Sequence, residues 1–362
     1  MKIAYFIGAL NRGGAETLIL DICRKHKDVP YDFVCIYRHE GNILNEFKQS
    51  GAPLIQISKK RGTLRYLLDV RRILKREQVT IVHSQTGANT FILALALVGT
   101  DIKIVTTFHG HLFADAPWWQ RMLVYRVSKK IICVSEYQKQ YYEEKWNLPR
   151  ENKFEVMYNG IDFTKLDNEQ NERVRELESE RINLAMVGNF IKGRSQNIIA
   201  QAIQKLKEKG IINFNFYFIG RRVEGESERY DSCVRYCEKN GLNNVHFLGS
   251  RSDVPAILRS IDGFVYSTEH DTFGIAVIEA IASELPIVVN DWPVMIEVCG
   301  AGNAGIRYFR TDDIEDASDK IASLLSNIDE SKKVAKENAQ LVRRKYSIEQ
   351  HIDNLNKAYQ SL

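Results

Sequence analysis

Asp271 and Glu279 lie eight residues apart in YSTEHDTFGIAVIEAIASE, the segment that spans residues 266–284. A strand-like run precedes Asp271, and a helix-like run follows Gly274. Glu279 falls in the second turn of that helix among apolar residues, where a carboxylate is costly unless it is hydrogen-bonded. A ligand hydroxyl is the obvious partner for this carboxylate, and a solvated flank of the helix is the alternative.

A second candidate site is the cationic loop in VGNFIKGRSQN, which begins at Gly188 after a strand-like run. The loop holds Lys192, Gly193 and Arg194 and leads into a helix-like segment. A glycine that allows close approach, a cation and the start of a helix together suit a phosphate group. The alternative is a solvated surface arginine.

In the first half of the chain, Gly13 and Gly14 open a helix after the first strand, but the dinucleotide fingerprint is missing. His109 stands at a strand end, where it is either a hydrogen-bond partner and proton carrier or a satisfied loop histidine. For His83 and His111 we favour the structural role. No carboxylate pattern accompanies the histidines, so we expect no metal site and no cofactor.

Strand-like and helix-like segments alternate along the chain, which predicts two doubly wound, Rossmann-like α/β domains facing each other across a cleft. The first domain is expected at residues 1–165 and the second at 181–340. Residues 166–180 are crowded with charged and amide side chains, so we expect a linker there. Residues 341–362 form a C-terminal helix that would pack back on the first domain.

The 362 residues suffice for two domains, and 44% hydrophobic with 27% charged residues is a globular composition. The six cysteines lack zinc or redox spacing, and the first residues show no cleavable signal pattern. These two features predict a reduced, cytoplasmic setting, and the longest apolar run is too short to span a bilayer. Residues 1–160 carry 24 Lys and Arg against 15 Asp and Glu, which favours an anionic partner or surface.

Together these motifs resemble the retaining glycosyltransferases of family 4, whose two Rossmann-like domains form the GT-B fold and many of which build bacterial polysaccharides. That family carries a Glu, seven residues and a second Glu in an EGFG-like stretch. The matching stretch here runs from Asp271 to Ala280 and keeps Phe273, Gly274 and Glu279. Further motifs occur in the family's order: Gly13 and Gly14, the His83 strand, TFHG at 107–110, VS at 134–135, NGID at 159–162, FLG at 247–249 and the Asp253 loop.

The resemblance implies an enzyme that moves a hexose or N-acetylhexosamine from a nucleotide-sugar, expected to be a UDP-sugar, to a saccharide acceptor. Glu279 would bind the ribose, Asp271 would bind hydroxyls of the transferred sugar, and Arg194 stands where the family has a phosphate-binding Lys. The expected catalytic residues are His109, Asp271 and Arg194. The expected donor contacts are Glu279, Arg194, Gly188 and the amides of Phe273, Gly274 and Ile275.

Two departures from the family concern the donor. Asp271 replaces the first Glu and shortens its reach by one methylene, which could alter the sugar that fits. Asn189 stands where the family usually has an Arg. One diphosphate contact is therefore missing or supplied elsewhere, for example by Arg221 or Arg222.

The segment from Lys59 to Arg76 is rich in Lys and Arg and has one apolar and one cationic side. It could dock on an anionic membrane or be a core-packed helix with a solvated basic face. Trp118 and Trp119 could contact an acceptor sugar, lipid headgroups or the other domain. With Gly13 and Gly14, they are the expected acceptor-binding residues. A lipid-linked acceptor would place the protein on the inner face of the cell membrane.

Three other classes of protein are alternatives to a glycosyltransferase. A catalytically silent nucleotide-sugar-binding or scaffold protein of the same fold is the main alternative, and donor hydrolysis distinguishes it from an enzyme. A nucleic-acid binder is disfavoured because it leaves Asp271 and Glu279 without a purpose, and we expect no nucleic-acid partner. A two-domain epimerase is disfavoured by the DTFG stretch at residues 271–274.

Overall fold

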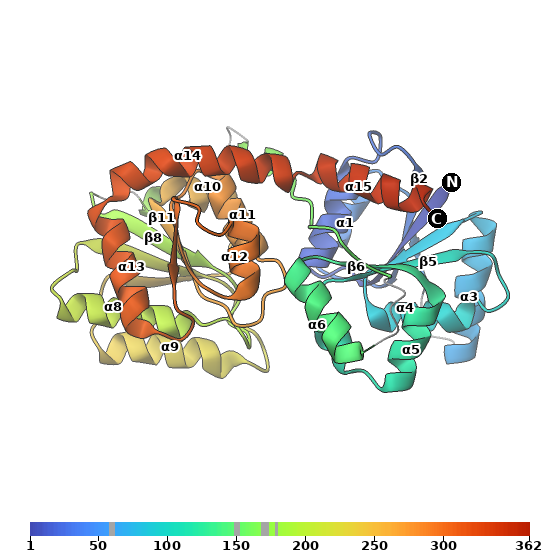
Figure 1. The fold of residues 1–362 in the computed structure, drawn as a ribbon, viewed down its shortest axis with the longest axis horizontal. Helices are drawn as coiled ribbons and strands as arrows, with labels where there is room; N and C mark the ends of the chain where they lie inside the picture. The colour runs from blue at the N-terminus through green and yellow to red at the C-terminus, as the bar shows by residue number, and fades with distance from the viewer. Residues whose placement is uncertain (58–61, 148–152, 168–173, 178–179) are drawn as a thin grey trace. The chain divides into compact units, whose positions relative to one another are not determined.

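The chain folds into two compact units in a computed structural model that describes residues 1–57, 62–147, 153–167, 174–177 and 180–362. Unit 1 comprises Met1–Asp162 together with Tyr346–Leu362, and unit 2 comprises Phe163–Lys345. Figure 1 shows that the last helix, drawn in red, belongs with the blue N-terminal elements of unit 1.

Unit 1 contains a parallel seven-stranded sheet in the order β3-β2-β1-β4-β5-β6-β7. Its strands are β1 (Lys2–Ala9), β2 (Asp32–His39), β3 (Leu54–Gln56), β4 (Ile81–Ser84), β5 (Lys103–Phe108), β6 (Ser128–Cys133) and β7 (Phe154–Val156). The middle of β1 and all of β4 are buried, as expected for parallel strands covered on both faces.

Helices cover both faces of this sheet because successive side chains of β1 point to opposite sides. Ile3, Tyr5 and Ile7 pack in a core with α1, α2 and α15, whereas Ala4 and Phe6 pack in a second core with α3 and α4. The helices of unit 1 are α1 (Gly14–Arg24), α2 (Leu44–Gln49), α3 (Thr63–Arg76), α4 (Gly87–Ala96), η1 (Leu112–Asp115), α5 (Trp118–Val127), α6 (Glu136–Trp146) and α15 (Ile348–Gln360).

Unit 2 contains a parallel six-stranded sheet in the order β10-β9-β8-β11-β12-β13. Its strands are β8 (Ile182–Val187), β9 (Phe214–Ile219), β10 (Val245–Gly249), β11 (Gly263–Tyr266), β12 (Ile287–Asn290) and β13 (Ile306–Phe309). Its helices are α7 (Thr164–Asp167), η2 (Arg175–Leu177), α8 (Gln196–Glu208), α9 (Ser227–Lys239), α10 (Val254–Ser260), α11 (Ile275–Ala282), α12 (Pro293–Cys299), α13 (Ile314–Ser326) and α14 (Ile328–Lys345). The predicted doubly wound α/β class is confirmed in both units.

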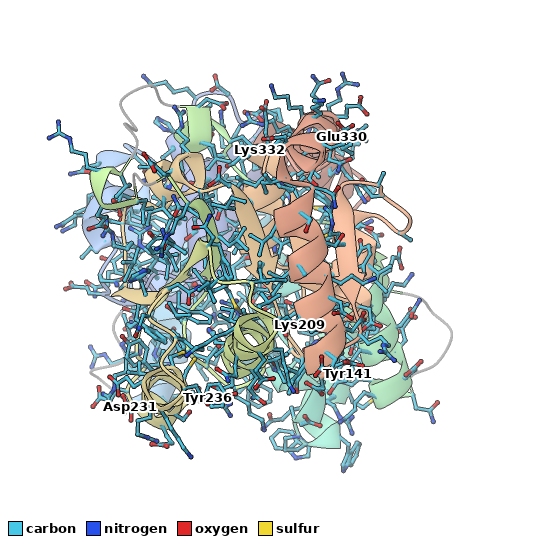
Figure 2. All side chains as sticks on the ribbon, turned by 90° about the vertical axis from the view of Figure 1, so that its left-hand side faces the viewer. Tyr141, Lys209, Asp231, Tyr236, Glu330 and Lys332 are labelled. Carbon is cyan, nitrogen blue, oxygen red and sulfur yellow. The ribbon has the colours of Figure 1, made fainter. Side chains whose placement is uncertain are left out.

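Charged side chains of unit 2 lie on the outer sides of its helices, and Figure 2 shows Lys209, Asp231 and Glu330 there. The ion pair between Lys209 and Asp319 (2.8 Å) is one of these surface contacts, and such exposed pairs add little stability. Of the predicted linker at residues 166–180, residues 168–173 and 178–179 lie outside the described part of the chain. Leu166 and Leu177 beside them are buried in unit 2.

The strand order places one switch point in each sheet, between β1 and β4 in unit 1 and between β8 and β11 in unit 2. At such a point the connections leave neighbouring strands in opposite directions, and ligands of open parallel sheets bind outside the carboxyl ends there. No helix in the described ranges is long and apolar enough to cross a membrane.

The C-terminal helix α15 is fixed to unit 1 by a buried network of polar side chains. Tyr359 contacts His83 of β4 through its hydroxyl (2.6 Å to Nδ1), and the other ring nitrogen of His83 contacts the Thr107 hydroxyl (2.7 Å). His351 of the same helix contacts the carbonyl oxygen of Tyr158 through Nδ1 (2.8 Å). Desolvation lowers the pKa of His83 to about 3 and that of His351 to about 4, so both rings are neutral at pH 7.

These two histidines should make unit 1 sensitive to mild acid. Their folded-state pKa values lie below the ordinary 6.5, so the unfolded chain binds more protons between about pH 4 and 6.5 and the folded state loses stability there. From pH 7 to 5 each histidine should lower the free energy of unfolding by about 2 kcal/mol, measured by urea denaturation. The variant His351→Asn keeps a donor near Tyr158 and should flatten this pH dependence. His39→Asn, at an exposed position, should not.

Candidate functional site

The loops that follow β8 and β11 are joined by backbone hydrogen bonds at the switch point of unit 2. The amide of Ser195 donates to the carbonyl of Ser267 (3.2 Å), and the amide of Glu269 donates to the carbonyl of Gly193 (2.8 Å). Gly193 has φ +82°, and a Cβ there would lie 2.2 Å from the Cβ of His270, so only glycine fits. The two loops therefore form one rigid surface at the carboxyl edge of the sheet.

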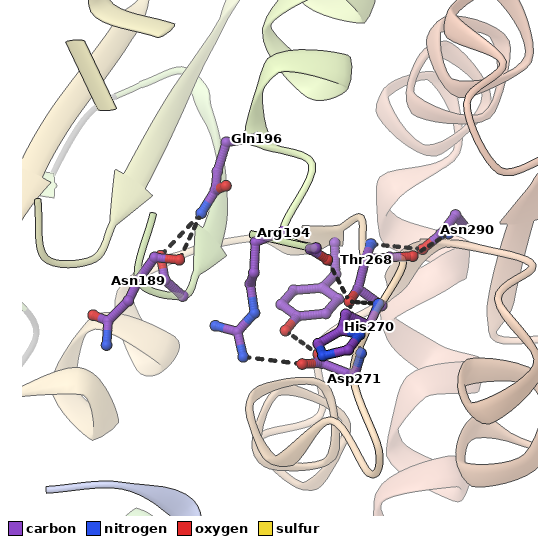
Figure 3. Close-up of polar contacts among 10 residues, drawn as sticks. Asn189, Arg194, Gln196, Thr268, His270, Asp271 and Asn290 are labelled. Atoms are coloured by element: carbon purple, nitrogen blue, oxygen red, sulfur yellow. Dashed lines mark hydrogen bonds and ion pairs between the residues drawn. The ribbon is translucent and has the colours of Figure 1, made fainter. Parts of the chain in front are cut away.

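Asn290, the last residue of β12, holds the β11 loop from the other side (Figure 3). Its Nδ2 donates to the carbonyl of Thr268 (2.7 Å) and to the hydroxyl of Thr311 (2.8 Å), and its Oδ1 accepts from the amide of Thr268 (3.0 Å). Because Asn290 is fully buried, both polar groups of the Thr268 backbone are satisfied inside the protein. The loop that carries Asp271 is thereby anchored to the sheet.

Arg194 and Asp271 form an ion pair between the two loops (Nη2 to Oδ1, 3.2 Å; Figure 3). The hydroxyl of Tyr266, at the end of β11, donates to the other carboxylate oxygen of Asp271 (2.5 Å). The guanidinium of Arg194 also lies over the Tyr266 ring, 5.5 Å from its centroid. The three side chains make one charge-balanced cluster at the sheet edge.

The protonation states in this cluster follow from burial and charge. Burial acts to lower the pKa of Arg194, but the nearby oxygens of Tyr266 and Asp271 outweigh it and raise this pKa above its ordinary value. Burial raises the pKa of the Tyr266 hydroxyl well above its usual range, so this hydroxyl stays protonated and can donate. The cluster thus holds a permanent cation and a neutral donor.

The backbone after β8 passes directly beneath the arginine. A Cβ at Gly188 would lie 2.3 Å from Nη1 of Arg194, so glycine is what lets the guanidinium lie against the strand end. Gln196 Nε2 donates to the carbonyls of Gly188 (3.1 Å) and Asn189 (3.2 Å), which fixes this turn (Figure 3). The Oδ1 atom of Asn189 accepts from the backbone amide of Arg221 (3.0 Å).

Of the two arginines considered as substitutes for a cation at Asn189, Arg222 is already engaged. It makes a bidentate ion pair with Asp231 (2.8 and 2.7 Å). Arg221 is exposed and follows β9, and its amide is the one that Asn189 holds. Of the two arginines, Arg221 is therefore the one whose backbone is tied to the Gly188 turn.

The start of α11 supplies a different kind of group. Gly274 precedes the helix with φ +81°, a conformation that glycine adopts without strain, and Phe273 beside it is buried. Ile275 is the first residue of α11, and Glu279 lies in the second turn, half-buried between buried Ile278 and Ala280. The first turn of the helix offers N–H groups and the positive end of its dipole.

In unit 1, His109 follows β5 and is half-buried, and its Nε2 contacts Oε1 of Gln85 (2.9 Å). Desolvation and the nearby His351 lower the pKa of His109 to about 3. Gly13 caps α1 in an extended conformation and Gly14 begins the helix, on a partly exposed loop. His109 is therefore neutral at pH 7 and suits hydrogen bonding better than proton donation.

The remaining predicted residues lie on the helices of unit 1. Trp118 and Trp119 begin α5 with 70% and 49% of their surface exposed. The basic segment from Lys59 to Arg76 is partly described: residues 58–61 lie outside the described part of the chain, and residues 63–76 form α3.

The structure thus brings Gly188, Arg194 and Asp271 together, with Gly274 at the start of the helix that follows, α11, and Glu279 in its second turn. The sequence interpretation missed Tyr266, Asn290 and Gln196. Tyr266 and Asn290 stand at strand ends, the position that singled out the other candidates, and this signal could have found them. In the described part of the chain, no group of three or more His, Cys, Asp or Glu side chains could hold a metal ion.

The sequence matches the family described as "Glycosyl transferases group 1" over residues 167–342 and "Glycosyltransferase Family 4" over residues 12–165. It is 25% identical to the capsular polysaccharide biosynthesis glycosyltransferase CapM of Staphylococcus aureus, over 81% of this chain and 80% of CapM. It is 24% identical to the Escherichia coli UDP-Gal:alpha-D-GlcNAc-diphosphoundecaprenol alpha-1,3-galactosyltransferase, over 63% and 62%. The crystal structure of Anabaena HepE in complex with UDP superposes with a TM-score of 0.84 and 16% identity, covering 100% of both chains.

The Asn290 anchor can be tested by its contribution to stability. Asn290→Ala leaves the buried amide and carbonyl of Thr268 without partners, so the free energy of unfolding should fall by about 2 to 4 kcal/mol. Asn327→Ala, at an exposed helix end, removes one bond to the Ser323 carbonyl and should cost less than about 1 kcal/mol. Equal losses in the two variants, measured by urea denaturation, would contradict the anchoring role.

Proposed function

The chain belongs to the family 4 type of glycosyltransferases with the GT-B fold, and from this premise we propose a specific reaction. It transfers a hexose or N-acetylhexosamine from a UDP-sugar to a saccharide acceptor, with retention of anomeric configuration, in surface-polysaccharide biosynthesis. The observation that carries the proposal is the cluster of Arg194, Asp271 and Tyr266 at the switch point of unit 2. The capsular relative CapM and the UDP complex of HepE support the pathway and the nucleotide.

In this proposal the donor binds at the carboxyl ends of β8 and β11. The half-buried carboxylate of Glu279 accepts hydrogen bonds from the ribose hydroxyls. The amides of Phe273, Gly274 and Ile275 meet the phosphate or sugar, as N–H groups at the start of a helix suit anions. Gly188 lets the diphosphate approach the backbone, and Asp271 accepts from hydroxyls of the transferred sugar.

Charge explains how this arrangement accelerates transfer. As the glycosidic bond breaks, the sugar gains oxocarbenium character and the diphosphate gains negative charge. Arg194 is a fixed cation beside the strand end, and the first turn of α11 adds oriented N–H groups, so both stabilise the leaving group. We propose that these groups suffice without a metal ion, with the acceptor attacking on the face that the diphosphate leaves.

Unit 1 provides the acceptor side of the proposed reaction. Gly13 and Gly14 leave the start of α1 open to a ligand. The neutral ring of His109 offers the acceptor a polar group without charge. The acceptor is proposed to be lipid-linked, a class named for the E. coli galactosyltransferase relative.

A lipid-linked acceptor agrees with the surface of α3, α4 and α5. These helices are neighbours, since α4 packs against both α3 and α5. Their exposed apolar side chains among the described residues are Leu64, Leu68, Leu95, Val98, Leu112, Trp118 and Trp119, counting those just beyond the helix ends. Arg65, Arg72 and Lys75 of α3 add positive charge. Apolar side chains beside cations fit an anionic lipid surface, so we propose a cytoplasmic protein peripheral to the inner face of the membrane.

Arg194→Ala should lower the rate of transfer more than it weakens nucleotide binding, because leaving-group charge is greatest in the transition state. Loss of one charge-assisted contact should reduce kcat by about 10- to 100-fold, measured as UDP release from a UDP-sugar. The matched control is Arg235→Ala, which removes an exposed arginine of α9 that pairs with Glu228. An unchanged kcat in Arg194→Ala would contradict the proposal that Arg194 stabilises the leaving diphosphate.

Membrane docking can be tested with vesicles of phosphatidylglycerol and phosphatidylcholine. Replacing Arg65, Arg72 and Lys75 by Glu should lower the binding constant for the vesicles, measured by co-sedimentation, by about a hundredfold. Each basic residue contributes about 1 kcal/mol to binding. Binding by the wild type should also fall as salt rises.

The control for membrane docking reverses Arg229, Arg235 and Lys239 of α9 in unit 2 and should leave sedimentation unchanged. Nucleotide binding should be intact in both triple variants. Vesicle binding that changes neither with salt nor with the charge reversal in α3 would exclude the electrostatic mechanism. It would instead indicate that Trp118 and Trp119 bind the membrane. An absence of vesicle binding would contradict the lipid-linked acceptor.

A further inference from the structure

Tyr266 lies at the end of β11 with its side chain fully buried, and it touches both charged residues of the cluster. We propose that Tyr266 is a positioning residue that fixes the Asp271 carboxylate and thereby determines which sugar the donor site accepts. This inference rests on the proposed function, because it assigns a specificity role within the same donor site.

The geometry fixes both oxygens of the carboxylate. Oδ1 of Asp271 faces Arg194 at 3.2 Å, and Oδ2 accepts from the Tyr266 hydroxyl at 2.5 Å. The backbone amide of Asp271 donates to the Thr268 hydroxyl (3.2 Å), so the residue is held at its backbone as well. A carboxylate has about four acceptor directions, and two fixed contacts leave the others with defined orientations for sugar hydroxyls.

The position of Tyr266 is itself set by the sheet. β11 pairs with β12 through Tyr266 and Val289, and the ring of Tyr266 stacks on Phe264 at 6.0 Å. A group on a strand is held more precisely than a group on a loop. The hydroxyl therefore marks a fixed point against which the β11 loop must place its carboxylate.

The short side chain of Asp271 makes this contact possible. Aspartate keeps its carboxylate one methylene nearer the backbone than glutamate, within reach of the hydroxyl at the strand end. Burial keeps that hydroxyl protonated by raising its pKa, so it donates throughout the neutral range. Tyr266 and Asp271 thus act as a pair, in which the tyrosine supplies rigidity that the aspartate alone would lack.

A fixed carboxylate discriminates between sugars that differ in the direction of one hydroxyl. Glucose and galactose differ in this way at a single carbon. A site whose acceptor cannot turn leaves the wrong epimer with an unpaired hydroxyl, whereas a carboxylate free to rotate accommodates both. Removing the Tyr266 hydroxyl should therefore affect the choice of sugar more than the affinity for the nucleotide.

The test uses Tyr266→Phe in the full chain, which removes only the hydroxyl. Calorimetry with UDP, UDP-glucose, UDP-galactose and UDP-N-acetylglucosamine gives the affinities, and UDP release gives the rate. We expect the affinity for UDP to stay within about twofold and UDP release from the preferred donor to fall about tenfold. The ratio of the UDP-release rate with that donor to the rate with its epimer should fall toward one.

The matched control is Tyr308→Phe, which removes a hydroxyl that donates to the Gly300 carbonyl (3.0 Å) in the same unit. It should change neither the rate nor the preference. A double-mutant cycle with Asp271→Asn measures whether the two residues affect donor discrimination through each other, which a purely structural role of Tyr266 would not require. Because the hydroxyl acts through the carboxylate, the double variant should lose no more discrimination than Asp271→Asn alone.

Unchanged discrimination in Tyr266→Phe, or equal losses of affinity for UDP and UDP-sugars, would overturn the role of Tyr266 alone. If the two substitutions reduced donor discrimination additively in the double-mutant cycle, the role of Tyr266 would be overturned as well. A wild-type protein that binds none of the four nucleotides would instead overturn the proposed function, and the Tyr266 inference with it. The wild-type titration therefore separates failure of the function from failure of the inference.

Discussion

The parallel pairing of β8 with β11 is the constraint on which the candidate site depends. Arg194 and Asp271 are 77 positions apart and meet because their two strands are neighbours that end at the same edge of the sheet. Backbone bonds then join the two loops, and Asn290 of β12 anchors the Asp271 loop. Three adjacent strands therefore set the geometry, so the charged groups are held in place before a ligand arrives.

The two units carry different electrostatics at their switch points. In unit 2 a half-buried cation and a half-buried carboxylate balance each other, and further hydrogen bonds help to offset the cost of removing such a pair from water. Tyr266 supplies one of these bonds. In unit 1, His83, His109 and His351 are neutral at pH 7 because burial lowers their pKa values. The cluster in unit 2 therefore carries charge that an anionic group can meet, whereas the three histidines of unit 1 add polarity without charge.

The strands and the fold class were predictable from the sequence because strands buried on both faces consist of short continuous apolar runs. Gly188, Arg194 and Asp271 were found because chemistry in such sheets gathers after the strands. The strand-end position could have singled out Tyr266 as well, but its contact with Asp271 was not predictable. A tyrosine that ends an apolar strand looks like a core residue, and only the fold shows that its hydroxyl reaches Asp271. The bonds of Asn290 were not predictable either, because its partners, the backbone of Thr268 and the hydroxyl of Thr311, lie on other segments.

The proposed donor site of unit 2 is tested by hydrogen–deuterium exchange of the full chain with and without a UDP-sugar. Backbone amides in the two loops are the groups that the proposed donor site presents to the nucleotide. We expect slower exchange at residues 188–196 and 267–279 of unit 2 when UDP-sugar is added, with no comparable change at α9. Unaltered exchange in those loops under saturating UDP-sugar, or protection confined to other segments, would contradict the donor site described here.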